Sequence, residues 1–138
     1  MKMLSRLMIA ALLLQSIPTF AQAQKKTAEA PAALRREFDA FLAKFRAALK
    51  ANDPAAVAGM TQLPFMKNDY YGDVTQFPTK GYPYLFPAKV RRCIADSNAD
   101  HDRDHEGNDS FFISCGEEIF VFSKTPRGFL FTAVGMND

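Results

Sequence analysis

The sequence lacks the local signatures of the common enzyme classes. It has no Gly-x-Ser-x-Gly motif, no glycine-rich phosphate loop, no His-Glu-x-x-His motif and no Cys-x-x-Cys motif. These motifs supply a nucleophilic serine, a phosphate cradle, a zinc site and a redox pair respectively. No catalytic residue is therefore assigned from the sequence, and no cofactor is expected.

A long hydrophobic run is also missing. The most apolar stretch, residues 7–14, falls well short of the roughly 20 residues needed to span a bilayer. It follows two basic residues, and Ala21-Gln22-Ala23 offers small residues for a cut before Gln24. This pattern predicts a secretory signal peptide over residues 1–23. Residues 24–30 are then a flexible start and 31–138 a single α+β domain, located in the periplasm or secreted.

The predicted mature chain has no excess charge of either sign. The full sequence has 17 Lys+Arg and 15 Asp+Glu, and removal of Lys2 and Arg6 with the signal leaves fifteen of each. A balanced domain has no general affinity for nucleic acid or for anionic lipid. Nucleic acid is therefore not an expected partner. No membrane span is expected in the mature chain either, because no other segment is apolar enough to cross a bilayer.

Cysteine is scarce, with only Cys93 and Cys115 present. An even pair in an exported protein favours a disulfide. The bond would close a loop of about 22 residues and stabilise the fold by about 3 kcal/mol. Two buried free thiols, which behave as small hydrophobic side chains, are the alternative.

The first half of the domain has the pattern of helices. Apolar residues recur at spacings of three and four, which predicts an amphipathic helix over 31–51: Leu34, Phe38, Phe41, Leu42, Phe45, Ala48 and Leu49. Asp53-Pro54 is typical of the start of a short second helix. Residues 64–87 hold all four tyrosines and half of the prolines, which predicts an irregular segment. A third helix is expected over residues 88–95.

The second half has the pattern of strands. Residues 96–109 contain no large apolar side chain and are expected to form a polar loop. Runs at about 110–115, 118–124 and 128–135 predict an antiparallel meander. Both faces of this meander are apolar, so the helices are expected to cover one face. The other face is expected to close over itself, line a pocket or form a homodimer.

This order of elements resembles the nuclear-transport-factor-2-like superfamily, and exported, uncharacterised bacterial members most of all. The similarity covers most of residues 31–137 and includes Leu63-Pro64-Phe65, Leu85-Phe86-Pro87 with Val90 and Ile94, and Gly128-Phe129-Leu130-Phe131. It implies N-terminal helices packed on a curved antiparallel sheet, a cone that often holds a pocket, and frequent dimerisation through the sheet. The fold hosts enzymes and binding domains alike, so the resemblance does not choose a function.

The acidic residues 96–109 are a weak metal candidate. Asp102, Asp104 and Glu106 match the start of a calcium loop, but its twelfth position is Ile113 instead of a carboxylate. His101 and His105 are four residues apart and would suit a transition metal on a helix. A solvated loop without metal is the simpler interpretation.

The tyrosine-rich segment is a candidate ligand site, with Tyr70, Tyr71, Tyr82 and Tyr84 as the lining residues. We expect a non-catalytic domain that binds a small molecule or a protein. The alternative is a pocket enzyme of the isomerase or hydrolase type that uses an Asp and a Tyr of residues 69–84, Asp69 and Asp73 being the nearby acids. A third possibility, an inhibitor of a host or competitor enzyme, rests on size and compartment alone.

Overall fold

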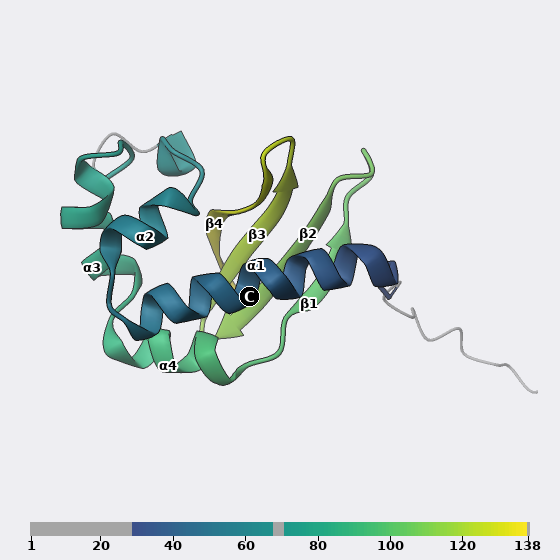
Figure 1. The fold of residues 1–138 in the computed structure, drawn as a ribbon, viewed down its shortest axis with the longest axis horizontal. Coiled ribbons are helices and arrows are strands. Elements are labelled where there is room, and N and C mark those ends of the chain that lie inside the picture. The colour runs from purple at the N-terminus through teal and green to yellow at the C-terminus, as the bar shows by residue number, and fades with distance from the viewer. Residues whose placement is uncertain (1–28, 68–70, 138) are drawn as a thin grey trace, which may run out of the picture.

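The fold is α+β, with helices followed by an open four-stranded antiparallel sheet (Figure 1). The computed structural model describes residues 29–67 and 71–137. Its elements are α1 (Ala32–Lys50), α2 (Pro54–Gly59), η1 (Phe65–Lys67), η2 (Phe77–Gly81), α3 (Tyr82–Leu85), α4 (Ala88–Asp96), β1 (Asp100–Arg103), β2 (Asp109–Cys115), β3 (Glu118–Thr125) and β4 (Gly128–Met136). The predicted signal peptide, Asp69 and Tyr70 lie outside the described residues.

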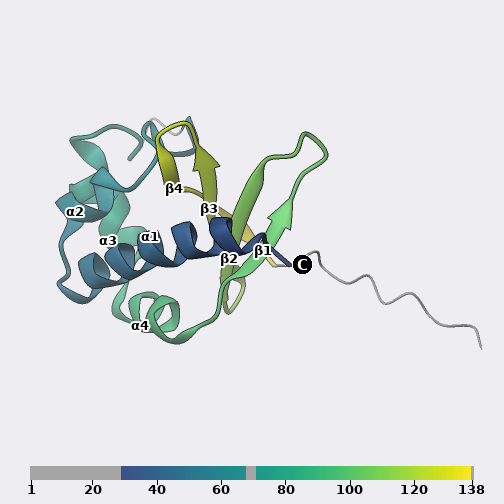
Figure 2. The same ribbon diagram turned by 45° about the vertical axis from the view of Figure 1, so that its right-hand side comes forward.

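Helix α1 lies across one face of the sheet, and α4 lies on the same side (Figures 1 and 2). The apolar stripe of α1 is buried, as the spacing of three and four residues predicts. It consists of Phe38, Leu42, Phe45, Ala48 and Leu49. Helices α2 and α3 gather at the C-terminal end of α1. The expected helices at 31–51 and 88–95 are confirmed to within a residue at each end.

The core between α1 and the sheet consists mainly of phenylalanine rings. The ring of Phe38 stacks on that of Phe111, with centroids 3.9 Å apart. Phe45 meets Phe122 edge-on at 5.1 Å, and both rings are fully buried. Interlocked aromatic pairs add to the hydrophobic stabilisation that their burial already provides. This packing fixes the position of α1 on the sheet.

The strands form the expected meander in the order β1-β2-β3-β4. Phe111, Phe122 and Phe131 pair across three strands and point into the core. Phe112 and Val121, next along their strands, point to the opposite face and are only partly buried. A homodimer through that opposite face stays a prediction.

The expectation of a polar loop over 96–109 is wrong in part. Residues 100–103 form strand β1, which pairs with β2 from Asp109 onward. The strand is short, charged and at the edge of the sheet, which is how proteins protect an exposed edge from further pairing. Because such a strand carries no large apolar residue, the hydrophobic pattern does not reveal it.

The disulfide is present and joins Cys93 of α4 to Cys115 at the end of β2. The alternative of two free thiols is therefore wrong. The bond ties the third large helix to the sheet at a point where the core offers only Val90 and Ile94 as buried anchors from that helix.

In residues 29–67 and 71–137, no helix combines the length and the apolar composition that a membrane crossing requires.

Truncation of a core ring tests the packing. We expect Phe38→Ala to lower the free energy of unfolding by about 3–5 kcal/mol, because it leaves a cavity beneath α1. Tyr84→Ala is the control, since Tyr84 is 72% exposed. It should change stability by less than about 1 kcal/mol. Urea denaturation followed by circular dichroism measures both, and equal losses in the two variants would contradict this account.

Removal of the disulfide tests how much the link between α4 and β2 stabilises the fold. We expect the double variant Cys93→Ser, Cys115→Ser to unfold at lower denaturant, with a loss of about 3 kcal/mol. In the wild-type protein, mass spectrometry without reductant should find neither thiol alkylated. Alkylation of both cysteines in unreduced protein would show that the bond does not form in solution.

Candidate functional site

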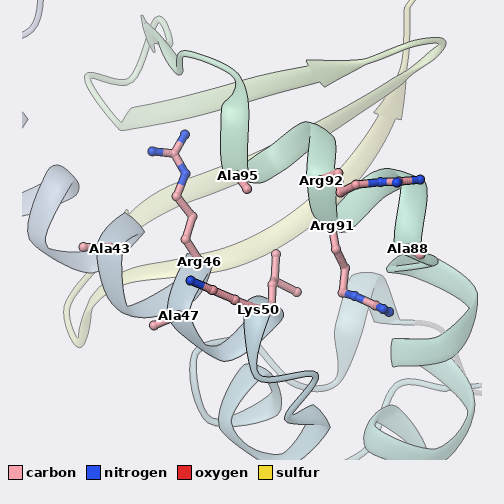
Figure 3. Close-up of a pocket in the computed structure, with 9 residues that line it drawn as sticks. Ala43, Arg46, Ala47, Lys50, Ala88, Arg91, Arg92 and Ala95 are labelled. Atoms are coloured by element: carbon pink, nitrogen blue, oxygen red, sulfur yellow. The ribbon is translucent and has the colours of Figure 1, made fainter.

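A groove of about 640 Å³ lies between α1 and α4 (Figure 3). We call it the basic groove. Its lining combines a small-residue floor with four cationic side chains and contains no carboxylate: Ala43, Arg46, Ala47, Leu49, Lys50, Ala88, Arg91, Arg92 and Ala95.

The groove follows from the helical periodicity of the two helices. Because Phe45 and Leu49 face the sheet, Arg46 and Lys50 come one position further round α1 and lie beside α4. In α4 the buried residues are Val90 and Ile94, and one side of the remaining helix surface borders the groove, through Ala88, Arg91, Arg92 and Ala95. The groove therefore lies between the sides of α1 and α4 that carry these cations and alanines.

Two of the four cations are held by backbone carbonyls. Arg46 donates from Nε to the carbonyl of Ile94 at 2.8 Å and from Nη2 to that of Ser97 at 2.5 Å. These carbonyls belong to the C-terminal end of α4, where a cation also stabilises the helix dipole. Arg91 donates from Nη1 to the carbonyl of Phe86 at 2.9 Å. Both guanidinium groups are therefore fixed at the rim without being neutralised.

The other two cations have no internal partner. Lys50 and Arg92 are exposed, and their side chains form no hydrogen bond or ion pair within the described part of the chain. Figure 3 shows the Arg92 side chain extending outward from α4 and that of Arg46 directed toward the end of the same helix. The basic groove therefore carries uncompensated positive charge.

A buried tyrosine lies next to the groove. Tyr82 donates its hydroxyl to Oδ1 of Asn52 at 2.8 Å and is 3% exposed. Burial raises the pKa of the Tyr82 phenol, and the nearby Arg91 charge partly opposes this rise. The phenol therefore stays protonated at neutral pH and acts here as a structural donor.

The predicted tyrosine site is not assembled as one surface within the described residues. Tyr71 packs near Tyr84, with ring centroids 5.9 Å apart, whereas Tyr82 is buried. Of the predicted partner acids, Asp73 is occupied locally. Its Oδ1 accepts bonds from the backbone of Gln76 and from the hydroxyl and backbone of Thr75, and these bonds lower the pKa of Asp73.

Tyr84 belongs to a second hollow, of about 650 Å³, beside the disulfide. Lys89, Glu117 and Glu118 all line it, so charges of both signs are present. Because these charges largely offset one another, we regard the hollow as the weaker of the two candidates.

The β1–β2 hairpin holds a cluster of three charged or titratable side chains. Asp109 Oδ1 lies 2.8 Å from Nε2 of His101 and accepts a bond of 2.8 Å from Nε of Arg103. Arg103 Nη2 reaches the second carboxylate oxygen at 3.0 Å. The bond from Arg103, with a smaller contribution from His101, holds the pKa of Asp109 below its ordinary value. The cluster closes the hairpin.

The residues considered as candidate metal ligands do not form a metal site within the described part of the chain. In the residues that the structure describes, no group of three or more His, Cys, Asp or Glu side chains is placed to hold a metal ion. Asp104 accepts bonds from the backbone of Glu106 and from the backbone and side chain of Asn108, so it shapes the turn instead. These bonds lower its pKa, Asn108 contributing most. His105 lies exposed on the same turn, and Asp102 is exposed in β1.

Sequence reasoning missed the basic groove. The available signal was the spacing of Arg46 and Lys50, which places both cations on one side of α1. Which helix faces that side is a tertiary fact, and the spacing alone does not supply it.

Comparison with known proteins yields no relative. No family model, no curated protein and no solved structure matches this chain. The resemblance to the nuclear-transport-factor-2-like superfamily therefore stays a prediction.

The hairpin cluster predicts a pH-dependent stability. The carboxylate of Asp109 has a folded pKa below the ordinary 3.8. The stabilisation that the ionised carboxylate provides is therefore complete above pH 3.8. It is lost as the pH falls through the lower pKa of Asp109 in the folded protein. We expect Asp109→Asn to lower the free energy of unfolding by about 1 kcal/mol at neutral pH. The difference from wild type should shrink toward about pH 2.

Asp102→Asn is the matched control, since it removes an exposed carboxylate from the same hairpin. Urea denaturation at both pH values measures the effect. A loss in Asp109→Asn that is the same at both pH values would contradict a role for the charge.

Proposed function

We propose that this protein is an exported, non-catalytic binding domain that holds an anionic ligand or partner in the basic groove. Export is supported by the signal-peptide pattern of residues 1–23, and the disulfide is compatible with an oxidising compartment. The periplasm and the exterior of the cell are the two locations consistent with that pattern.

The observation that carries the proposal is the unbalanced charge of the groove. Four cations line it without a carboxylate, although the predicted mature chain has equal numbers of acids and bases. Within residues 29–67 and 71–137, the side chains of Lys50 and Arg92 form no hydrogen bond or ion pair. Positive side chains gathered around an apolar floor attract an anion by charge and retain it by contact.

Binding is favoured over catalysis by what the described residues bring together. The Tyr82 hydroxyl bonds to Asn52, and the Asp73 carboxylate is held by its neighbours in the chain. Among the described side chains, neither group is hydrogen-bonded to an acid or a histidine that could exchange its proton. With Asp73 engaged in this way, a pocket enzyme that uses an acid of residues 69–84 would need Asp69, which lies outside the described residues. No observation on the described part of the chain favours that alternative.

Membership of the nuclear-transport-factor-2-like superfamily is part of the same proposal. Helices that precede an open antiparallel sheet are the coarse feature that agrees with it. The superfamily contains binding domains, so a binding function is compatible with this membership without depending on it.

Titration with a small apolar anion tests the groove. We expect the arylsulfonate dye ANS to shift the backbone amide resonances of α1 and α4 in NMR spectra of the folded protein. Reversal of the two unpartnered charges, Lys50→Glu with Arg92→Glu, should weaken this binding by about tenfold or more.

The control is Lys80→Glu with Arg127→Glu, which changes the net charge equally at exposed positions outside the groove. It should leave the affinity within about twofold of wild type. Equal weakening in the two double variants would mean that net charge alone attracts the dye, and would reject a site in the groove.

A further inference from the structure

The cations of the basic groove form two rows rather than a single point. Arg46 and Lys50 are four residues apart on α1, while Arg91 and Arg92 lie on the facing helix. From Ala43 to Lys50 the wall of α1 is about 10 Å long, which corresponds to about three residues of extended peptide. The groove therefore suits an occupant that carries several negative charges along its length.

The floor of the groove allows a close approach. Ala43, Ala47, Ala88 and Ala95 are exposed there and present nothing larger than a methyl group. A polypeptide backbone can contact such a surface directly, as when a peptide lies in a groove between helices. Larger side chains would hold it off.

The same lining argues against nucleic acid and membrane. Binding of single-stranded nucleic acid uses aromatic side chains on which bases stack, and the groove has none. Among the described residues the large apolar side chains that are exposed are Met66, Val74, Tyr84 and Met136, and none of them lines the groove. A membrane-binding surface needs such side chains to enter the lipid.

The fixed arginines favour a carboxylate-rich partner. Arg46 and Arg91 are already held by backbone carbonyls, so little side-chain entropy is lost when they meet an anion. Lys50 and Arg92 are left to reach further carboxylates along a bound chain.

We propose that the basic groove binds an acidic segment of a partner protein, with its carboxylates between the two rows of cations and its backbone on the alanine floor. This inference rests on the proposed function and adds the chemical class of the occupant.

Binding of a labelled, end-capped hexaglutamate to the full chain tests the inference. By fluorescence anisotropy at low ionic strength, we expect it to bind at least about tenfold more tightly than inorganic phosphate does in competition. Capped hexalysine should not bind. Ala47→Trp, which fills the floor and keeps every charge, should weaken hexaglutamate binding about tenfold. Ala33→Trp, exposed on the same helix outside the groove, should not.

The other outcomes of this experiment show whether this inference alone fails or the proposed function fails with it. If phosphate competes as well as the peptide and Lys50→Glu with Arg92→Glu abolishes both, the groove is a small-anion site, so the proposed function stands and this inference fails. If the chain instead sediments with vesicles containing phosphatidylserine and ignores hexaglutamate, the occupant is a lipid surface and the inference also fails. If no anion binds, the proposed function fails too.

Discussion

The contact between the phenylalanine stripe of α1 and the inner face of the sheet is the constraint on which the rest depends. Phe38 and Phe45 are fully buried against rings from three strands. A helix rotated by even one position would move these rings out of the core, so the packing fixes the rotation of α1 as well as its place. The direction in which every other residue of α1 points then follows.

Two arginines on α1 bind the segments that pack beside this helix. Arg35 donates to the carbonyl of Ala99, just before β1, and lies over the ring of Phe111. Arg46, three turns further on, holds the C-terminal end of α4. The disulfide secures the same helix from the side of the sheet. Helix α4 is thus held by α1 on one side and by the sheet on the other, and the basic groove forms where α4 meets α1. Arg46 both joins the two helices and contributes positive charge to the groove.

Much of the fold was predictable, because burial imposes a period on the sequence. The helix at 32–50 and the three strands of the meander follow from spacings of three, four and two. Strand β1 was not predictable, since it buries a single side chain, that of the polar residue His101, and so has no apolar alternation. The disulfide was predictable as a pair, and its place between α4 and β2 depended on both elements being correct. The spacing of the acids at 102–106 suggested a calcium loop as one candidate, but Asp104 accepts hydrogen bonds within a turn, and such bonds cannot be read from residue spacing.

The sequence by itself determined the α+β class, the principal helices and the meander, because each depends on a local period. It also determined that any disulfide within the chain must join Cys93 to Cys115, because cysteine is present only twice. Only the tertiary structure decided that the cations of α1 and α4 share one groove. Arg46 and Arg92 are far apart along the chain, and nothing in the periodicity of either helix states which helix lies opposite. That choice is made by the volume of the aromatic rings beneath them and by a disulfide that holds α4 in place.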